Sequence, residues 1–159
     1  METVEVRPAS SADAAYIRST LQDQWGTTIV VRRGEPTDAT LLPAIVAWRG
    51  GTRVGLATFR TLADLREIVT LDAIPPGMGT GAAMIRALRA QAYEDGIRRL
   101  WLITTNDNTR ALRFYQRCGF DLVALHRNAL DVARQMKPQI PLEVDGIPLR
   151  HELELALEP

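Results

Sequence analysis

The sequence predicts one α/β domain built around a mixed sheet, and three observations support this. The chain has 159 residues, enough for one domain with its own core. Short β-branched stretches alternate along it with amphipathic stretches of helical period. Its composition, 46% hydrophobic and 24% charged, is that of a globular protein. Because no repeat, low-complexity segment or linker is visible, we expect residues 1–159 to form a single domain.

The first half predicts a strand, a helix and then a meander of strands. Residues 4–7 alternate in polarity and end at Pro8, which predicts a short strand. Gly50 and Gly51 separate two apolar runs, as expected for a tight hairpin. The expected elements are a strand at 4–7, a helix at 11–25, a strand at 27–33, a turn-rich connection at 34–43, a hairpin at 44–61 and a strand at 65–74.

The second half predicts a parallel arrangement around two crossover helices. The first helix follows a glycine-rich loop and ends before Gly96. The run at 98–105 is almost continuously apolar, which is typical of a strand buried on both faces. The second helix, within 106–118, can be capped by Asn106, Asp107 or Asn108. The remaining expected elements are a strand at 120–125, a short helix at 128–136 and a final strand at 151–158.

Charge and residue counts exclude several classes of function. Nineteen basic and nineteen acidic side chains cancel, so we expect no nucleic acid and no membrane as partner. The apolar runs are too short to cross a bilayer, and the N-terminus lacks the pattern of a signal peptide. One cysteine, Cys118, and two histidines predict neither an internal disulfide nor a metal site. A cytoplasmic location is the expectation.

Three closely spaced glycines precede the central helix. Gly77, Gly79 and Gly81 allow close backbone approach, and a helix N-terminus favours an anion, so a phosphate site is indicated. An ordinary glycine-rich turn is the alternative. A dinucleotide-binding motif is excluded because two prolines separate the strand from the glycines and Ile97 stands near the position expected for an acidic residue. A P-loop is excluded because the required lysine is missing.

Over residues 67–120 the chain resembles the GNAT superfamily of acyl-CoA-dependent N-acyltransferases. The family pattern [QR]-x-x-G-x-[GA] is matched from Pro76 through Gly79 and Gly81. The pattern N-x-x-A-x-x-x-Y, followed by Gly-Phe, is matched at 108–120. One departure is Pro76, which replaces the usual Arg or Gln. Without that polar side chain, more of the pyrophosphate binding would depend on backbone N–H groups, with Arg86 or Arg113 as helpers.

The resemblance implies a GNAT fold with a sheet of about seven strands and an N-acetyltransferase that takes acetyl-CoA as cosubstrate. The acceptor would be an amine of a small molecule or peptide, attacked directly in a ternary complex, and a homodimer is plausible for the family. The alternative is a non-catalytic module that binds or senses acyl-CoA. The residues implied in cofactor binding are Val69, Leu71, Gly77, Met78, Gly79, Thr80, Gly81, Ala82 and Asn108.

Two side chains are predicted to be catalytic by the same resemblance. Tyr115 would protonate the departing thiolate, although its place on an apolar helical stripe is also typical of a core aromatic. Glu67 would be the general base; otherwise it is a solvated strand residue paired with Arg66 or with an arginine across the sheet. Strict alternation along the strand would place Asp72 on the opposite face, which makes it the weaker choice.

Overall fold

The structure is a computed structural model that describes residues 2–159. It contains four α-helices and eleven strands. The helices are α1 (Ala14–Trp25), α2 (Thr80–Glu94), α3 (Thr109–Arg117) and α4 (Ala129–Met136). The strands of the main sheet are β1 (Glu5–Pro8), β4 (Ala44–Arg49), β5 (Thr52–Leu62), β6 (Leu65–Ala73), β7 (Arg99–Thr105), β8 (Asp121–His126) and β11 (Glu152–Leu157). Two small hairpins are formed by β2 (Ile29–Arg32) with β3 (Glu35–Asp38), and by β9 (Glu143–Val144) with β10 (Ile147–Pro148).

The seven main strands lie in the order β1-β4-β5-β6-β7-β11-β8, which confirms a mixed α/β sheet. The first four pair antiparallel, and β6 and β7 form its parallel pair. The sequence predicted a more extensively parallel second half. Instead β11, from the far end of the chain, inserts antiparallel between β7 and β8.

Local signals placed most elements correctly. Gly50 and Gly51 have φ of 54° and 79°, as the β4–β5 turn requires. The Asn108 side chain accepts a hydrogen bond of 3.1 Å from the Ala111 backbone N–H, so Asn108 is the cap of α3. The connection expected at 34–43 contains β3, because Glu35–Asp38 folds back on β2.

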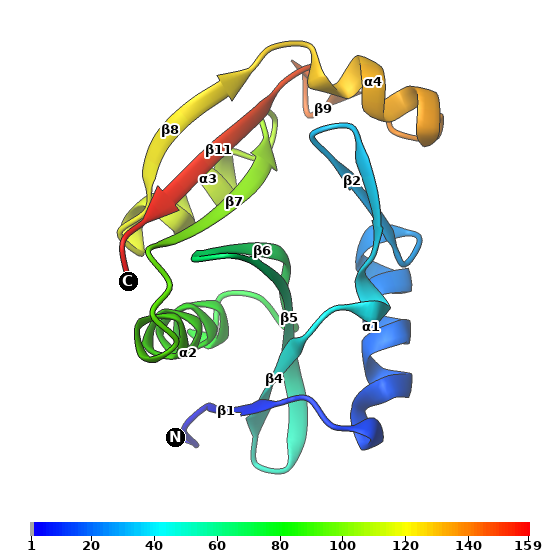
Figure 1. Ribbon diagram of the computed structural model, residues 1–159. Coiled ribbons are helices and arrows are strands. Elements are labelled where there is room, and N and C mark those ends of the chain that lie inside the picture. The colour runs from blue at the N-terminus through cyan, green and yellow to red at the C-terminus, as the bar shows by residue number, and fades with distance from the viewer. Residues whose placement is uncertain (1) are drawn as a thin grey trace.

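Two apolar layers hold α1 on one face of the sheet and α2 and α3 on the other (Figure 1). One layer packs α2 and α3 against the sheet and includes Met84, Leu88 and Leu102. The other packs α1 against β4, β5 and β6. The prediction that the strand at 98–105 is buried on both faces is wrong. Leu102 is buried while Trp101 is only half-buried, because α1 covers β4–β6 rather than β7.

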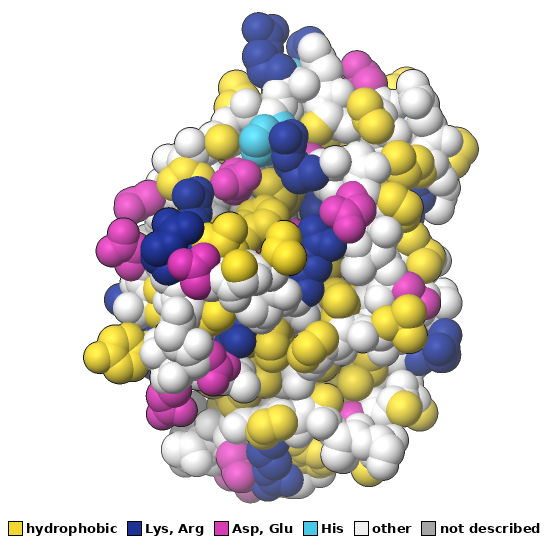
Figure 2. Space-filling model, in the orientation of Figure 1, with side chains coloured by type: hydrophobic (Ala, Val, Ile, Leu, Met, Phe, Trp, Pro, Cys, Tyr) yellow, Lys and Arg dark blue, Asp and Glu magenta, His cyan; other side chains and the backbone are white. Residues whose placement is uncertain are grey.

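Within residues 2–159 no helix is long and apolar enough to cross a membrane. The same residues contain no His, Cys, Asp and Glu group that could hold a metal ion. On the face shown in Figure 2, basic and acidic side chains lie interspersed. Strand β8 is an edge of the sheet, with Leu122 and Leu125 about half exposed. The homodimer stays a prediction.

Candidate functional site

The parallel strands β6 and β7 separate part-way along their length. They pair from Leu65 opposite Arg99 to Ile68 opposite Leu102, and β6 continues to Ala73 without β7 beside it. A cavity of about 310 Å³ opens where they part. Its lining comes from α1, β6, β7 and α3: Gln24, Trp25, Ile68, Val69, Thr70, Leu71, Asp72, Leu102, Ile103, Thr104, Asn108, Ala111 and Tyr115. The predicted cofactor strand, with Val69 and Leu71, therefore borders the cavity.

A β-bulge in β6 decides which side chains face this cavity. Thr70 lies opposite Thr58 and Ile68 lies opposite Phe59, so Val69 is an extra residue without a partner of its own in β5. The hydroxyl oxygens of Thr58 and Thr70 are 2.7 Å apart and fix this register. The bulge breaks the strict alternation of side chains, so residues after it change face relative to the expected pattern.

The expected orientation of Asp72 is wrong for this reason. Val69 packs in the apolar layer beneath α1, and Asp72 hydrogen-bonds to Trp25 at the end of α1. Glu67 contacts Arg32 of β2, on that same side of the sheet. Asp72 and Glu67 therefore share a face.

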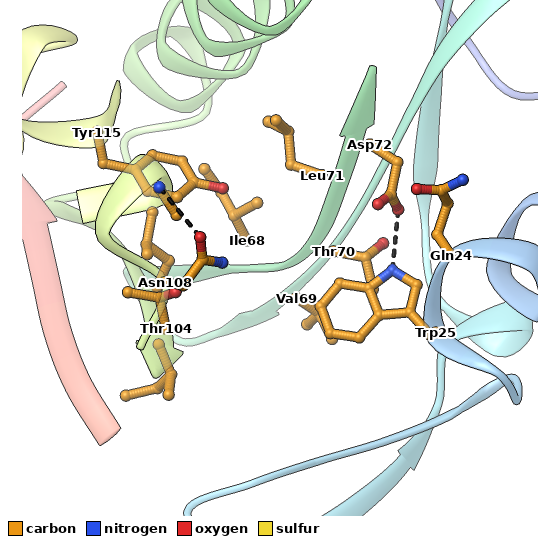
Figure 3. A pocket seen from close by; sticks show the side chains of 13 residues that line it. Gln24, Trp25, Ile68, Val69, Thr70, Leu71, Asp72, Thr104, Asn108 and Tyr115 are labelled. Atoms are coloured by element: carbon orange, nitrogen blue, oxygen red, sulfur yellow. Dashed lines mark hydrogen bonds between the residues drawn. The ribbon is translucent and has the colours of Figure 1, made fainter. Parts of the chain in front are cut away.

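Asp72 carries a carboxylate held at the wall of the cavity. The indole Nε1–H of Trp25 donates a hydrogen bond of 2.9 Å to its Oδ2 atom (Figure 3). Burial raises the pKa of Asp72 to about 6, and the Trp25 hydrogen bond opposes part of this rise. At neutral pH the group is therefore mostly ionised, yet close enough to its pKa to exchange a proton.

Tyr115 lies across the cavity from Asp72, with Val69, Thr70 and Leu71 between them (Figure 3). Its ring packs edge-to-face on Phe114 and Phe120, at centroid distances of 5.1 and 5.6 Å. Burial raises the pKa of the phenol, which keeps the hydroxyl protonated. Tyr115 therefore packs its ring in the apolar core and also lines the cavity.

Glu67 does not line this cavity. Its side chain is 2% exposed and is held by three charged hydrogen bonds. Arg32 donates from Nε at 2.6 Å and Nη2 at 2.7 Å, and Arg60, opposite it in β5, donates from Nε at 2.8 Å. The carboxylate borders a separate cavity that includes Glu35 and Trp101. The structure thus shows the pairing with an arginine across the sheet, whereas the expected solvated position is wrong because Glu67 is buried.

The glycine loop forms the floor of a second cavity, of about 590 Å³. Gly77 and Gly79 have φ of 80° and 79°, which favours glycine at both positions, and Gly79 is the cap of α2. A Cβ on Gly81 would lie 3.0 Å from the Phe114 ring, so this glycine lets α2 and α3 pack closely. The N–H groups of the first turn, including that of Ala82, have no partner within the helix and suit an anion.

Two other predicted loop residues differ in exposure. The side chain of Thr80 is buried, and that of Met78 is exposed. The carbonyl of Met78 accepts a hydrogen bond of 2.9 Å from Arg49.

The two cavities meet at Tyr115. Both are lined by Leu71, Asn108, Ala111 and Tyr115, so an elongated ligand could reach from the glycine loop to the splayed strands. Asn108 caps α3 and borders both cavities, as the sequence allowed.

Sequence reasoning did not anticipate the importance of α1. Trp25, the last residue of this helix, is 36% exposed and donates its indole N–H to Asp72. Its position in the last residue of a helix, directly before Gly26, was the available signal, because an indole at a helix end can keep its N–H outside the core.

Comparison with known proteins decides the family. The sequence model of the acetyltransferase (GNAT) family matches residues 14–120. The chain belongs to the GNAT family of acetyltransferases. It is 44% identical over 106 residues to the uncharacterized protein YxbD of Bacillus subtilis (strain 168), spanning 66% of this chain and 67% of that protein. It is 36% identical over 104 residues to YdhI of the same organism, spanning 65% of each.

Solved structures share the GNAT fold over the whole chain. A Bacillus subtilis acetyltransferase in complex with CoA matches with a TM-score of 0.70 at 17% identity, covering 100% of this chain and 99% of that one. A GNAT family acetyltransferase from Elizabethkingia anophelis, with acetyl-CoA bound, matches with a TM-score of 0.71 at 16% identity and covers 100% of both chains. These matches confirm the predicted fold class.

Proposed function

We propose that this protein transfers an acetyl group from acetyl-CoA to a primary amine by direct attack. The observation that carries the proposal is that Tyr115 and Asp72 line opposite sides of one cavity where β6 and β7 separate. Solved structures of the same fold contain CoA or acetyl-CoA, which supports acetyl-CoA as the donor.

The residues present fit acetyl-CoA in two places. The backbone N–H groups from Gly77 to Ala82 would bind the diphosphate, because the loop is bare of Cβ atoms and α2 begins there. The stretch of β6 around Val69 and Leu71, which has no β7 beside it, would hydrogen-bond the pantetheine amides. Acetyl-CoA would supply an activated thioester.

The chemistry then needs one proton acceptor and one proton donor. The Asp72 carboxylate pairs with the incoming amine and accepts its proton as the C–N bond forms. The Tyr115 hydroxyl, which burial keeps protonated, gives its proton to the sulfur as the C–S bond breaks. The proton that Asp72 took from the amine balances this loss when the phenol is reprotonated through solvent. We assign the base to Asp72 rather than to Glu67, whose carboxylate is already occupied by two arginines. Because no cysteine lines the cavity, transfer proceeds without a cysteine-bound intermediate.

An assay of free thiol tests the proposal. Purified protein is mixed with acetyl-CoA, alone and with a panel of primary amines, and thiol release is followed over time. Release that depends on an amine, with an acetylated amine found by mass spectrometry, supports the proposal. Tight binding of acetyl-CoA without release by any amine would instead identify the non-catalytic sensing module.

A further inference from the structure

Helix α3 presents a row of arginines beside the glycine loop. Arg110, Arg113 and Arg117 are spaced by three and four residues, so they lie along one side of the helix. All three are exposed. None of them forms an ion pair with a carboxylate of residues 2–159. Most arginines of the strands, such as Arg32 and Arg60, do form one.

These arginines border a cavity that continues the predicted cofactor site outward. This outer cavity, of about 420 Å³, is lined by Ala82, Arg110, Arg113, Phe114, Arg117 and Cys118. Ala82, Arg110, Phe114 and Arg117 also line the cavity of the glycine loop. Arg113 lines the outer cavity but not the cavity of the glycine loop, so a ligand group that contacts Arg113 differs from the one bound by the loop.

The electrostatics of the outer cavity favour an anion. Its lining contains three guanidinium groups and no carboxylate. Arg86 of α2 adds a fourth charge nearby, because the positive charges of Arg86 and Arg117 both act on the Cys118 thiol and oppose the rise in its pKa caused by burial. A phosphate monoester, with a charge of about −1.5 to −2 near neutral pH, is the anion that such a guanidinium cluster prefers.

We propose that Arg113, assisted by Arg110 and Arg117, binds the 3′-phosphate of coenzyme A, an assignment that rests on the proposed function. The diphosphate has its own partners in the N–H groups of the glycine loop. The 3′-phosphate is the remaining anionic group of coenzyme A, and the outer cavity is the adjoining basic site. The arginine row compensates for Pro76, which removes the loop side chain that would otherwise add to affinity.

Calorimetric titration with CoA and with 3′-dephospho-CoA tests this directly, because the two ligands differ by one phosphate. We expect the wild type to bind CoA at least tenfold more tightly. Arg113→Gln should weaken CoA binding about tenfold and leave 3′-dephospho-CoA binding unchanged. Arg127→Gln, an exposed change on the turn after β8, is the matched control and should alter neither value.

Three results would overturn the assignment in distinguishable ways. Equal affinity of the wild type for the two ligands would show that the 3′-phosphate is not recognised. An equal loss for both ligands in Arg113→Gln would place the arginine on the diphosphate or on general attraction. Binding of neither ligand by the wild type would overturn the proposed function together with this inference.

Discussion

The Asp72 carboxylate accepts a hydrogen bond from the Trp25 indole, and its pKa of about 6 sets the pH range in which it can act as a base. As a base it must be ionised, so kcat/KM of the wild type should fall as pH drops below about 6. Asp72→Asn should lower kcat/KM at least about a hundredfold at pH 7 and remove this limb of the profile. The measurement is the pH dependence of amine-dependent thiol release.

Replacing the Trp25 indole gives a second test of the same pH profile. Its hydrogen bond lowers the pKa of Asp72, so Trp25→Phe should move the acidic limb to higher pH while keeping activity at pH 8. A profile unchanged in both variants would remove Asp72 from the proton path.

Tyr115 is predicted to act on the leaving sulfur. Tyr115→Phe keeps the ring packing on Phe114 and Phe120 but removes the hydroxyl, so kcat should fall about a hundredfold with little change in the affinity for acetyl-CoA. Single-turnover thiol release and calorimetry separate the two effects. Tyr93→Phe, at a 74% exposed position of α2, is the control, and equal rates in both variants would reject the role.

Burial of Asp72 also predicts a pH-dependent cost in stability. Its folded pKa of about 6 exceeds the reference value of 3.8, so the folded state binds this proton more tightly than the unfolded state. The wild type is therefore penalised as pH rises from about 4 through about 6. Between pH 4 and pH 8, Asp72→Asn should gain about 2 kcal/mol in unfolding free energy relative to the wild type. Urea titrations at the two pH values measure the difference; a constant offset would contradict it.

At the scale of elements, the β2–β3 hairpin is tied to the sheet by the buried ion pair of Arg32 and Glu67. Glu67→Gln leaves the Arg32 guanidinium, 6% exposed, without its counter-charge. The free energy of unfolding should drop by about 3 kcal/mol. Glu35→Gln breaks a solvent-exposed pair with Arg60 and should cost less than about 1 kcal/mol. Denaturant titration of both variants compares the two pairs.

The same variant separates stability from chemistry. If Glu67 is structural, folded Glu67→Gln protein retains the acidic limb of the pH profile. Loss of that limb in Glu67→Gln, with Asp72 intact, would restore Glu67 as the base.

Most helices and strands could be predicted from local signals, while the site depended on a feature that such signals do not carry. Asn108 and the glycine pair of the β4–β5 hairpin mark their elements by side-chain and backbone chemistry. The motif residues Gly79 and Tyr115 were identified because the segments that contain them resemble the two GNAT patterns. Asp72 was not identified as the preferred base, because the bulge at Val69 arises from the register of β6 against β5, which local sequence does not reveal.

At the scale of the whole molecule, the cofactor cavity lies between two halves of one sheet. Strands β1, β4, β5 and β6 form one half and β7, β11 and β8 the other, and β6 and β7 pair over only part of their length. A ligand seated in the splay contacts both halves. Acetyl-CoA at a hundredfold excess over its Kd should therefore stabilise the fold by about 2.7 kcal/mol. Hydrogen exchange should slow on both sides of the splay, and protection limited to α2 would contradict bridging.

The extra residue at Val69 has a consequence for how such enzymes diverge. Deleting one codon there would restore regular alternation and turn the downstream carboxylate toward the opposite layer, without altering the chemistry of any remaining side chain. Under the proposed function, the number of residues in β6 would thus decide whether this acid faces the proposed acceptor site. A one-residue deletion would then abolish amine-dependent turnover even though every functional side chain is still present.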